Sequence, residues 1–336
     1  MPRTITYLQA LGEALDHEMR RDSTVVAFGE DTIGGTGCEG RLGNAWGPTR
    51  GLHERFPRQI LDTPITEAAF VGAAVGAAAT GLRPVVDLLF VDFAGVCFDQ
   101  LLNQAAKLSY MVDGKARVPM VVRALYGAGM RRGAQHSQTL YSLFAHVPGL
   151  KVAVPATPYD AKGLLIEAIR DDDPVLFFEH KMLYFAPGEV PEEAYTVPFG
   201  QAATLRRGDD VTVVAIGRMV GFALAAAEEL AADGIECEVV DPRTISPLDE
   251  ESIYASVRGT GRLVVVDESH PRCSVASDIA ALVAQNCFPA LRAPVRMVTA
   301  PHCPVPFSPP LEDAFVPGPA DIAAAVRDLV GARTGA

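Results

Sequence analysis

Hydrophobic residues along this chain follow two alternating periodicities. Leu8, Leu11, Leu15 and Met19 recur three or four positions apart, which is typical of one face of a helix. Short runs of Val, Ile, Leu and Phe between such stripes are typical of buried strands. In the first half of the chain, the pattern predicts strands at 25–28, 84–90, 118–123, 151–154 and 175–178, and helices at 66–81, 94–111 and 158–170. Beyond residue 208 it predicts strands at 211–216, 236–240, 263–267 and 295–299, and helices at 220–232, 248–257, 274–285 and 320–330.

Strands that alternate with helices indicate parallel sheets covered on both faces, so the predicted fold class is α/β throughout. A chain of 336 residues is long for a single core. The periodicity disappears between residues 181 and 208, where several prolines occur. We therefore predict two domains with mainly parallel sheets, at 1–180 and 209–336, joined by a linker at 181–208.

Charge and cysteine usage narrow the class of protein. The net charge is −12 and no basic run occurs, which argues against a nucleic-acid or anionic-membrane partner. The six cysteines include no Cys-x-x-Cys pair, and several lie in apolar runs, which favours buried thiols in a reducing compartment. Because the N-terminus enters a helical pattern without a recognisable signal, transit or spanning segment, we expect a cytoplasmic protein.

The predicted helix at 66–81 consists almost entirely of Ala, Gly and Val. Gly72 and Gly76 lie four positions apart and hence on one face, which suits close approach by another backbone or a flat ligand. Glu67 is the single carboxylate of its first turn. An acid at this position either offsets the positive end of the helix dipole or has a chemical role, and this segment alone leaves both interpretations open.

Two polar segments and one glycine motif are further candidates for a functional site. A glycine-rich loop at 125–138 carries His136, which is either functional or simply an exposed loop histidine. The acids at 171–173 follow a predicted helix and oppose its dipole, so a basic partner, a cation or a merely solvated turn could explain them. Residues 35–40 match the dinucleotide fingerprint formally, but they neither follow a strand directly nor open a helix, so we reject them as a nucleotide site.

Four blocks of residues, in this order, carry a resemblance to a known family: Gly-Glu-Asp at 29–31, Asp-Thr-Pro-Ile-Thr-Glu at 62–67, Ala-Gln-His-Ser-Gln at 134–138 and Thr-Pro-Tyr-Asp-Ala-Lys-Gly at 157–163. Over essentially its whole length the chain resembles the β subunits of thiamine-diphosphate-dependent 2-oxo acid dehydrogenase complexes. The loop at 301–309 is most similar to that of acetoin dehydrogenase β subunits. The resemblance implies a transketolase-like pyrimidine-binding domain followed by a transketolase C-terminal-type domain.

The resemblance also implies roles for individual residues. Glu67 would hydrogen-bond N1′ of the cofactor's aminopyrimidine and so favour the tautomer that removes the thiazolium proton. Phe93 would stack on the aminopyrimidine, and Glu30 would belong to a carboxylate network beside it. His136 would lie near the reacting carbon and help to pass the acyl group to lipoamide. A structural potassium ion would be held by carbonyls or side chains of Met120, Ala168, Asp171 and Asp173.

The sequence lacks the motif that binds the other half of this cofactor. Enzymes of this class hold the diphosphate and Mg²⁺ through Gly-Asp-Gly followed by Asn. No Gly-Asp-Gly occurs here, and Asn44, Asn103 and Asn286 are the only asparagines. We therefore expect the chain to be inactive alone and to require an α subunit.

The implied assembly is an α2β2 heterotetramer, with a second β subunit and a lipoyl-bearing dihydrolipoyl acyltransferase as further partners. The implied activity is a thiamine-diphosphate-dependent oxidoreductase that cleaves acetoin, or decarboxylates a 2-oxo acid, and reductively acylates lipoamide. One alternative is the β subunit of a pyruvate or branched-chain 2-oxo acid dehydrogenase. An alternative of another class is a non-catalytic assembly subunit.

Overall fold

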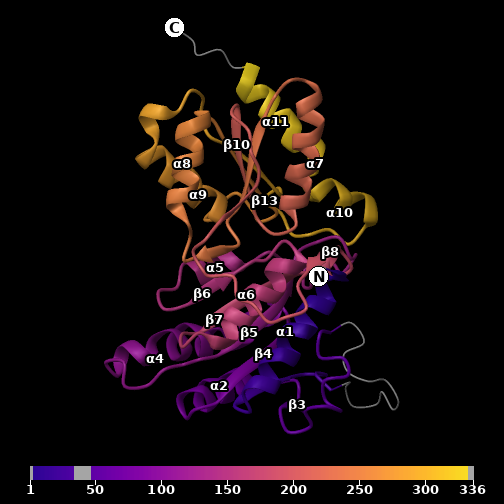
Figure 1. Cartoon of the computed structure of the whole chain (residues 1–336), viewed down its shortest axis with the longest axis vertical. Coiled ribbons are helices and arrows are strands. Elements are labelled where there is room, and N and C mark those ends of the chain that lie inside the picture. Colours follow the sequence, from indigo (N-terminus) through magenta and orange to yellow (C-terminus); the bar gives the residue numbers. More distant parts are fainter. Residues whose placement is uncertain (1–2, 34–46, 332–336) are drawn as a thin grey trace. The chain divides into compact units, whose positions relative to one another are not determined.

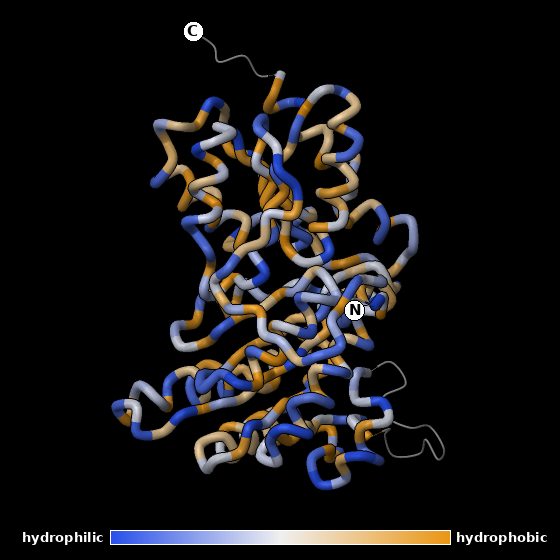
Figure 2. Tube along the Cα trace, viewed as in Figure 1, coloured by the Kyte–Doolittle hydropathy of each residue, from blue (hydrophilic) through white to orange (hydrophobic). Residues whose placement is uncertain are grey.

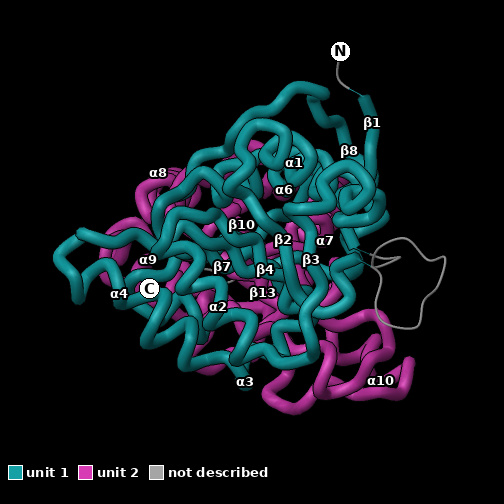
Figure 3. The backbone as a smooth tube through the Cα atoms, turned by 90° about the horizontal axis from the view of Figure 1, so that it is seen from below, with its two compact units in different colours: residues 1–126, 143–199 teal, residues 127–142, 200–336 magenta. Residues whose placement is uncertain are grey.

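The computed structural model describes residues 3–33 and 47–331. The chain divides into two compact units, of which the first contains residues 1–126 and 143–199 and the second contains residues 127–142 and 200–336 (Figure 3). The rejected glycine motif at 35–40 lies outside the described residues.

A parallel sheet forms the centre of the first unit, with strands in the order β6-β7-β5-β4-β2-β3. Its strands are β2 (Val25–Gly29), β3 (Ile60–Asp62), β4 (Arg83–Phe90), β5 (Val121–Tyr126), β6 (Lys151–Ala153) and β7 (Val175–His180). A separate antiparallel pair is formed by β1 (Arg3–Thr6) and β8 (Pro187–Val190). The carboxyl ends of β2 and β4 therefore meet at one edge of the sheet, where α/β proteins position ligands.

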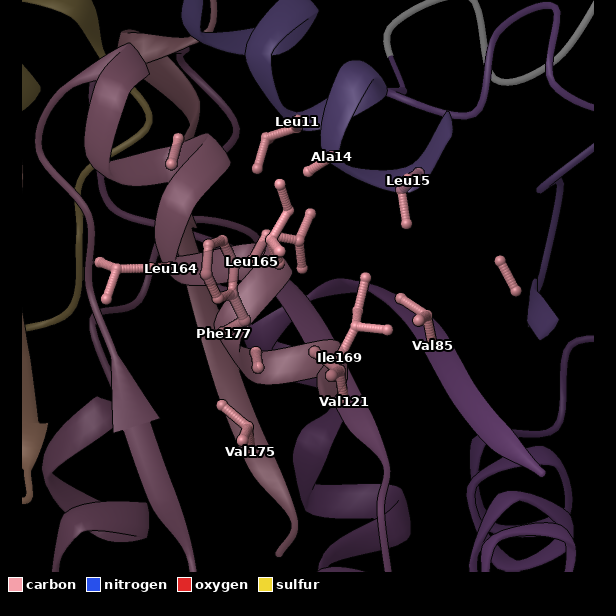
Figure 4. Close-up of a cluster of buried hydrophobic side chains, with 14 of the residues drawn as sticks. Leu11, Ala14, Leu15, Val85, Val121, Leu164, Leu165, Ile169, Val175 and Phe177 are labelled. Carbon is pink, nitrogen blue, oxygen red and sulfur yellow. The ribbon is translucent and has the colours of Figure 1, made fainter. Parts of the chain in front are cut away.

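Helices cover both faces of this sheet. They are α1 (Tyr7–Arg21), α2 (Glu67–Ala79), α3 (Ala94–Asp99), a π-helical turn (Gln100–Ala105), α4 (Ala106–Met111), α5 (Tyr141–Ala145) and α6 (Pro158–Arg170). Figure 3 shows α1 and α6 on one side of β2 and β4, and α2 and α3 on the other. The apolar stripe of α1 packs with α6 onto the sheet, where Leu11, Leu165 and Phe177 are fully buried (Figure 4).

Local sequence explains where these helices begin. At α1, Thr6 and Gln9 form a capping box in which each side chain accepts the other's backbone N–H, at 3.2 and 2.9 Å. At α6, the Thr157 hydroxyl accepts the Asp160 N–H at 3.1 Å, and Pro158 occupies the first turn, where no N–H is needed.

The second unit contains its own mainly parallel sheet, in the order β14-β13-β10-β11-β9, with only β9 antiparallel to its neighbour. Its elements are β9 (Ala203–Arg206), β10 (Val211–Ala215), α7 (Met219–Ala232), β11 (Cys237–Asp241), β12 (Thr244–Ser246), α8 (Glu250–Thr260), β13 (Leu263–Asp267), α9 (Val275–Asn286), β14 (Arg296–Thr299), α10 (Pro309–Phe315) and α11 (Pro319–Gly331). Helices α8 and α9 lie on one side of β10 and β13, and α7 and α11 lie on the other (Figure 1). The hydrophobic residues gather along these central strands (Figure 2).

The predicted α/β fold class with mainly parallel sheets is confirmed. The strand predicted at 118–123 begins later, at Val121, because Pro119 has no N–H to give to a sheet. The helix predicted at 94–111 is divided by the π-helical turn. Strands β1, β3, β8 and β9 were not predicted, because they are short and form through pairing with distant segments.

The predicted linker at 181–208 and the observed division differ in two ways. Residues 181–199 belong to the first unit and contain β8, while 200–208 belong to the second and contain β9. Residues 127–142 leave the first unit and fold with the second, which the periodicity of their flanking strands gave no reason to expect.

Two findings bear on the expected class of protein. No helix in the described part of the chain is long and apolar enough to cross a membrane. Of the cysteines the structure describes, Cys97, Cys237 and Cys287 are buried thiols, whereas Cys273 and Cys303 are exposed.

Candidate active site

Glu67 is the first residue of α2, and its side chain is buried although it carries a carboxylate. The helix starts because the Thr66 carbonyl accepts the N–H groups of Ala69 and Phe70 at 2.9 and 3.0 Å. Glu67 is only 9% exposed as a whole residue. An acid that merely offsets a helix dipole is normally in contact with water, so this burial favours a chemical role.

Glu30 follows β2 directly, at the carboxyl edge of the sheet. Gly29 is paired with Asp87 of the neighbouring parallel strand β4. A Cβ atom on Gly29 would lie 2.2 Å from the Asp87 carbonyl oxygen, so any other residue would push the two strands apart. The glycine is therefore required for the close approach that brings Glu30 and Asp87 to the same edge.

Glu30, Glu67 and Asp87 form a cluster of negative charge. Burial raises the pKa of Glu30, and the charges of Glu67, Asp31 and Asp87 raise it further. Its Oε2 atom is buried and has no hydrogen-bond partner among the described residues. A carboxyl in this setting retains a proton more readily than one in water, so the cluster is suited to sharing and moving a proton.

Arg123 of β5 provides a positive charge next to Asp87 of this cluster. Its guanidinium donates two hydrogen bonds to Glu179, at 2.6 and 2.8 Å, and lies 3.5 Å from Asp87 Oδ2. Burial by itself would lower the pKa of Arg123, but the Glu179 and Asp87 carboxylates raise it, so the guanidinium stays charged. The Tyr184 hydroxyl adds a further hydrogen bond to Glu179, at 2.6 Å.

Sequence reasoning missed Asp87, Arg123 and Glu179. The available signal was the occurrence of charged residues inside apolar strands, since such residues are almost never fully buried without a partner. Asp87 and Arg123 are register partners on β4 and β5, which only the strand order could reveal.

Phe93 and Cys97 belong to the segment that follows β4. Phe93 ends a 3₁₀ turn (Val91–Phe93), is half-buried and contacts Phe90 edge-to-face with centroids 5.7 Å apart. Cys97 of α3 is fully buried beside Glu67; burial, and then the Glu67 charge, raise the pKa of its thiol to about 12. This thiol therefore stays neutral and contributes to the apolar surroundings of Glu67.

The two glycines of α2 have different surroundings. A Cβ at Gly72 would meet the Gln100 amide oxygen at 3.0 Å, so this glycine allows α2 to approach the π-helical turn. A Cβ at Gly76 would meet nothing within 4 Å, and Gly76 itself is exposed. The close approach expected at both glycines is therefore made within the described chain only at Gly72.

His136 lies in the second unit, in the loop between β5 and α5, and is half-buried. Its backbone N–H donates to the Gly133 carbonyl at 3.3 Å. The structure thus brings Glu30 and Glu67 together with Asp87, whereas His136 belongs to a separately folded segment.

Two of the four residues expected to hold potassium, Asp171 and Asp173, contact a lysine. Lys151 Nζ lies 2.8 and 2.6 Å from the two Asp171 oxygens and 3.2 Å from Asp173. The Met120 carbonyl accepts the Val175 N–H at 2.9 Å, and Ala168 is a buried residue of α6.

The acids at 171–173 therefore have a basic partner, which was one of the explanations left open. Because the Lys151 ammonium supplies the charge that a cation would bring, these residues fit a bare potassium ion poorly. The described residues also contain no group of three or more His, Cys, Asp or Glu that could hold a metal ion. The potassium ion stays a prediction.

Comparison with known proteins agrees with this arrangement. Residues 3–187 match the transketolase pyrimidine-binding domain, and residues 200–322 match the transketolase C-terminal domain. The chain is 57% identical over 331 residues to the β subunit of acetoin:2,6-dichlorophenolindophenol oxidoreductase from Cupriavidus necator, with 97% of this chain and 98% of the relative covered.

The chain belongs to the family of transketolase-like dehydrogenase β subunits. A relative of the same name from Bacillus subtilis is 52% identical, with 98% of each chain covered. A pyruvate dehydrogenase E1 β subunit from Rickettsia felis is 44% identical, with 97% of this chain and 98% of the relative covered. The fold is shared with a solved split-gene transketolase described as an inactive β4 tetramer, at a TM-score of 0.79, 24% identity and 97% and 98% coverage.

Replacing Glu179 with Gln should strongly destabilise this dehydrogenase β subunit. Arg123 would remain buried with only the longer contact to Asp87, at 3.5 Å, to balance its charge, so we expect the free energy of unfolding to fall by about 3–5 kcal/mol. Asp172→Asn is the matched control, because this exposed partner of Arg83 lies in the same unit and its loss should cost less than about 1 kcal/mol. Urea unfolding of both variants measures the difference, and equal losses would contradict the proposed importance of the buried pair.

Replacing Glu30 with Gln should stabilise the β subunit in a pH-dependent way. Because folding raises the pKa of Glu30, its contribution to stability is present below the unfolded pKa and is lost as the pH rises through the folded pKa. The variant should therefore melt higher than the wild type near pH 8, and this advantage should disappear towards about pH 4. Thermal melts across this range test the sign. Glu54→Gln, at an exposed acid of the same unit, is the control, and an advantage that grows towards low pH would contradict the assignment.

Proposed function

We propose that this chain is the β subunit of a thiamine-diphosphate-dependent dehydrogenase component that cleaves acetoin and reductively acylates lipoamide. The observation that carries the proposal is the pairing of Glu67, which is only 9% exposed at the start of α2, with Glu30, whose buried Oε2 has no hydrogen-bond partner among the described residues. A buried carboxyl oxygen without a donor, such as Glu30 Oε2, is costly for folding alone, which supports a polar ligand at this cluster, and an aminopyrimidine nitrogen would be the partner of Glu67.

The residues of this chain fit the pyrimidine half of the cofactor. Thiamine diphosphate, when bound, supplies the carbon nucleophile that breaks the bond beside a carbonyl. Glu67 would hold a proton at the pyrimidine N1′, and the raised pKa of Glu30 would keep the neighbouring carboxyl from adding a second full charge. Phe93 would stack on the pyrimidine, and the Ala and Val residues of α2 would exclude water from the carboxyl.

A partner chain would complete the site. The sequence has no Gly-Asp-Gly, so the diphosphate and Mg²⁺ would be held by an α subunit, in an α2β2 heterotetramer with a second β subunit. Apolar side chains near the site support a partner, since Ile65 and Val96 are 74% and 62% exposed. A lipoyl-bearing acyltransferase would receive the acyl group, with His136 near the reacting carbon. The cytoplasm is the expected location.

The αβ pair, rather than either chain alone, should oxidise acetoin with 2,6-dichlorophenolindophenol as acceptor, the dye in the names of the two acetoin relatives. We expect acetoin to give a larger kcat/KM than pyruvate or branched-chain 2-oxo acids. Steady-state assays with each substrate measure this preference. A preference for a 2-oxo acid would favour the pyruvate or branched-chain alternative, and cofactor binding by the α subunit alone would favour a non-catalytic assembly subunit.

Replacing Glu67 with Gln should lower the dye-reduction rate of the αβ pair by about 10²–10⁴-fold, because an amide cannot take over the proton of the carboxyl. The complex should still assemble, which size-exclusion chromatography checks. Glu54→Gln, at an exposed acid of the same unit, is the matched control and should leave the rate unchanged. Near-normal turnover by the Glu67 variant would refute its assignment.

A further inference from the structure

The loop that carries His136 is held by buried carboxylates from distant parts of the second unit. Glu312 of α10 is completely buried, and Glu268, just after β13, is 3% exposed. The Ala128 N–H donates to Glu268 Oε1 at 2.6 Å, and the Gly129 N–H donates to Glu312 Oε1 at 2.7 Å. These two carboxylates therefore act as acceptors for consecutive backbone groups at the start of the loop.

Arg131 gives Glu312 its second and third donors. Its backbone N–H and its guanidinium reach Glu312 Oε2 at 3.0 and 2.7 Å. Arg131 has a φ of +56°, in the left-handed region that residues with a side chain rarely adopt. Such a backbone persists only where the surroundings fix it, and here the Glu312 carboxylate binds both the main chain and the side chain of the same residue.

The rest of the loop is fixed at its base and on one side. The Gly127 N–H donates to the Gln138 carbonyl at 3.1 Å, which closes the loop around His136. Gly133 has a φ of +72°, and a Cβ there would meet the Phe307 ring at 3.4 Å. Ala128 also packs with Ala300, Val305 and Phe315. The proline-rich segment around 301–310 therefore serves as a support for this loop.

We propose that Glu312 is a positioning residue that acts through this loop to present His136, with Glu268 fixing the loop at Ala128. The inference rests on the proposed function for the role of His136. It assigns α10 and the 301–310 segment a part in acyl transfer, although neither carries a reacting group.

Hydrogen exchange of the αβ complex tests the contact with the loop. In Glu312→Gln the new NH₂ group would face either the Gly129 N–H or the two Arg131 donors, and in both orientations at least one donor of the loop loses its acceptor, so peptides covering 127–135 should exchange about 10-fold faster or more. Asp313→Asn is the matched control, because it removes only the exposed partner of Arg131 and should leave exchange unchanged. Glu312→Asp keeps the charge and should exchange at an intermediate rate. Unchanged exchange in Glu312→Gln would overturn the proposal.

Kinetics of the same complex distinguish positioning from simple stabilisation. Glu312→Gln and His136→Ala should each lower the lipoamide-dependent rate about 10- to 100-fold, while dye reduction changes much less. The double variant should be no slower than His136→Ala alone, because Glu312 acts through that residue. Losses that multiply would overturn the proposal. The hydrogen-exchange measurement does not depend on activity, so it tests the loop contact in any case. A wild-type complex that does not reduce the dye would refute the proposed function, not the contact between Glu312 and the loop.

Discussion

The buried guanidinium of Arg123 is the interaction on which the first unit depends. It lies inside a parallel sheet, donates two hydrogen bonds to Glu179 and approaches Asp87. Burial and the charges of Glu67, Asp31 and Asp87 already raise the pKa of Glu30. The Arg123 guanidinium balances the charge of Asp87 from within the sheet. Burying a charge inside the sheet carries a desolvation cost that a hydrophobic residue at the same position would not have. It allows several carboxyl groups to be gathered at one edge, and the proposed proton chemistry requires such a group of carboxyls.

Close packing brings those carboxyl groups together. Gly29 allows β2 and β4 to approach, so Glu30 and Asp87 reach the same edge. Helix α2 then brings Glu67 to this edge on a scaffold of small residues, and Cys97 contributes an apolar neighbour whose thiol stays neutral. The result is a carboxyl cluster that suits the proposed pyrimidine half of a cofactor site, in a family whose named members are β subunits.

The second unit contributes in a different way, because its central feature is a loop rather than a charge cluster. Residues 127–142 lie between two elements of the first unit in sequence but fold with the second. Backbone N–H groups of this loop donate hydrogen bonds to the carboxylates of Glu268 and Glu312. The backbone of Arg131 has a positive φ, a conformation that such hydrogen bonds must stabilise. One chain therefore provides a carboxyl cluster from one unit and a rigidly held histidine loop from the other.

The sequence by itself determined the fold class, most of the strands and helices, and the family, because these depend on local periodicity and on contiguous motifs. The helix at 158–170 and the strand at 263–267 have the predicted bounds. Pro158 marks the start of the helix and the apolar run defines the strand, and both are signals that lie within a few residues of the element. The contacts of Asp87, Arg123, Glu179 and Glu312, and the partner of the 171–173 acids, were decided only by the tertiary structure. The physical reason is that each of these contacts joins residues that are far apart in the sequence. Lys151 and Asp171 are separated by 20 positions, and Arg131 and Glu312 by 181. A local pattern of hydrophobic and polar residues cannot indicate such a pairing.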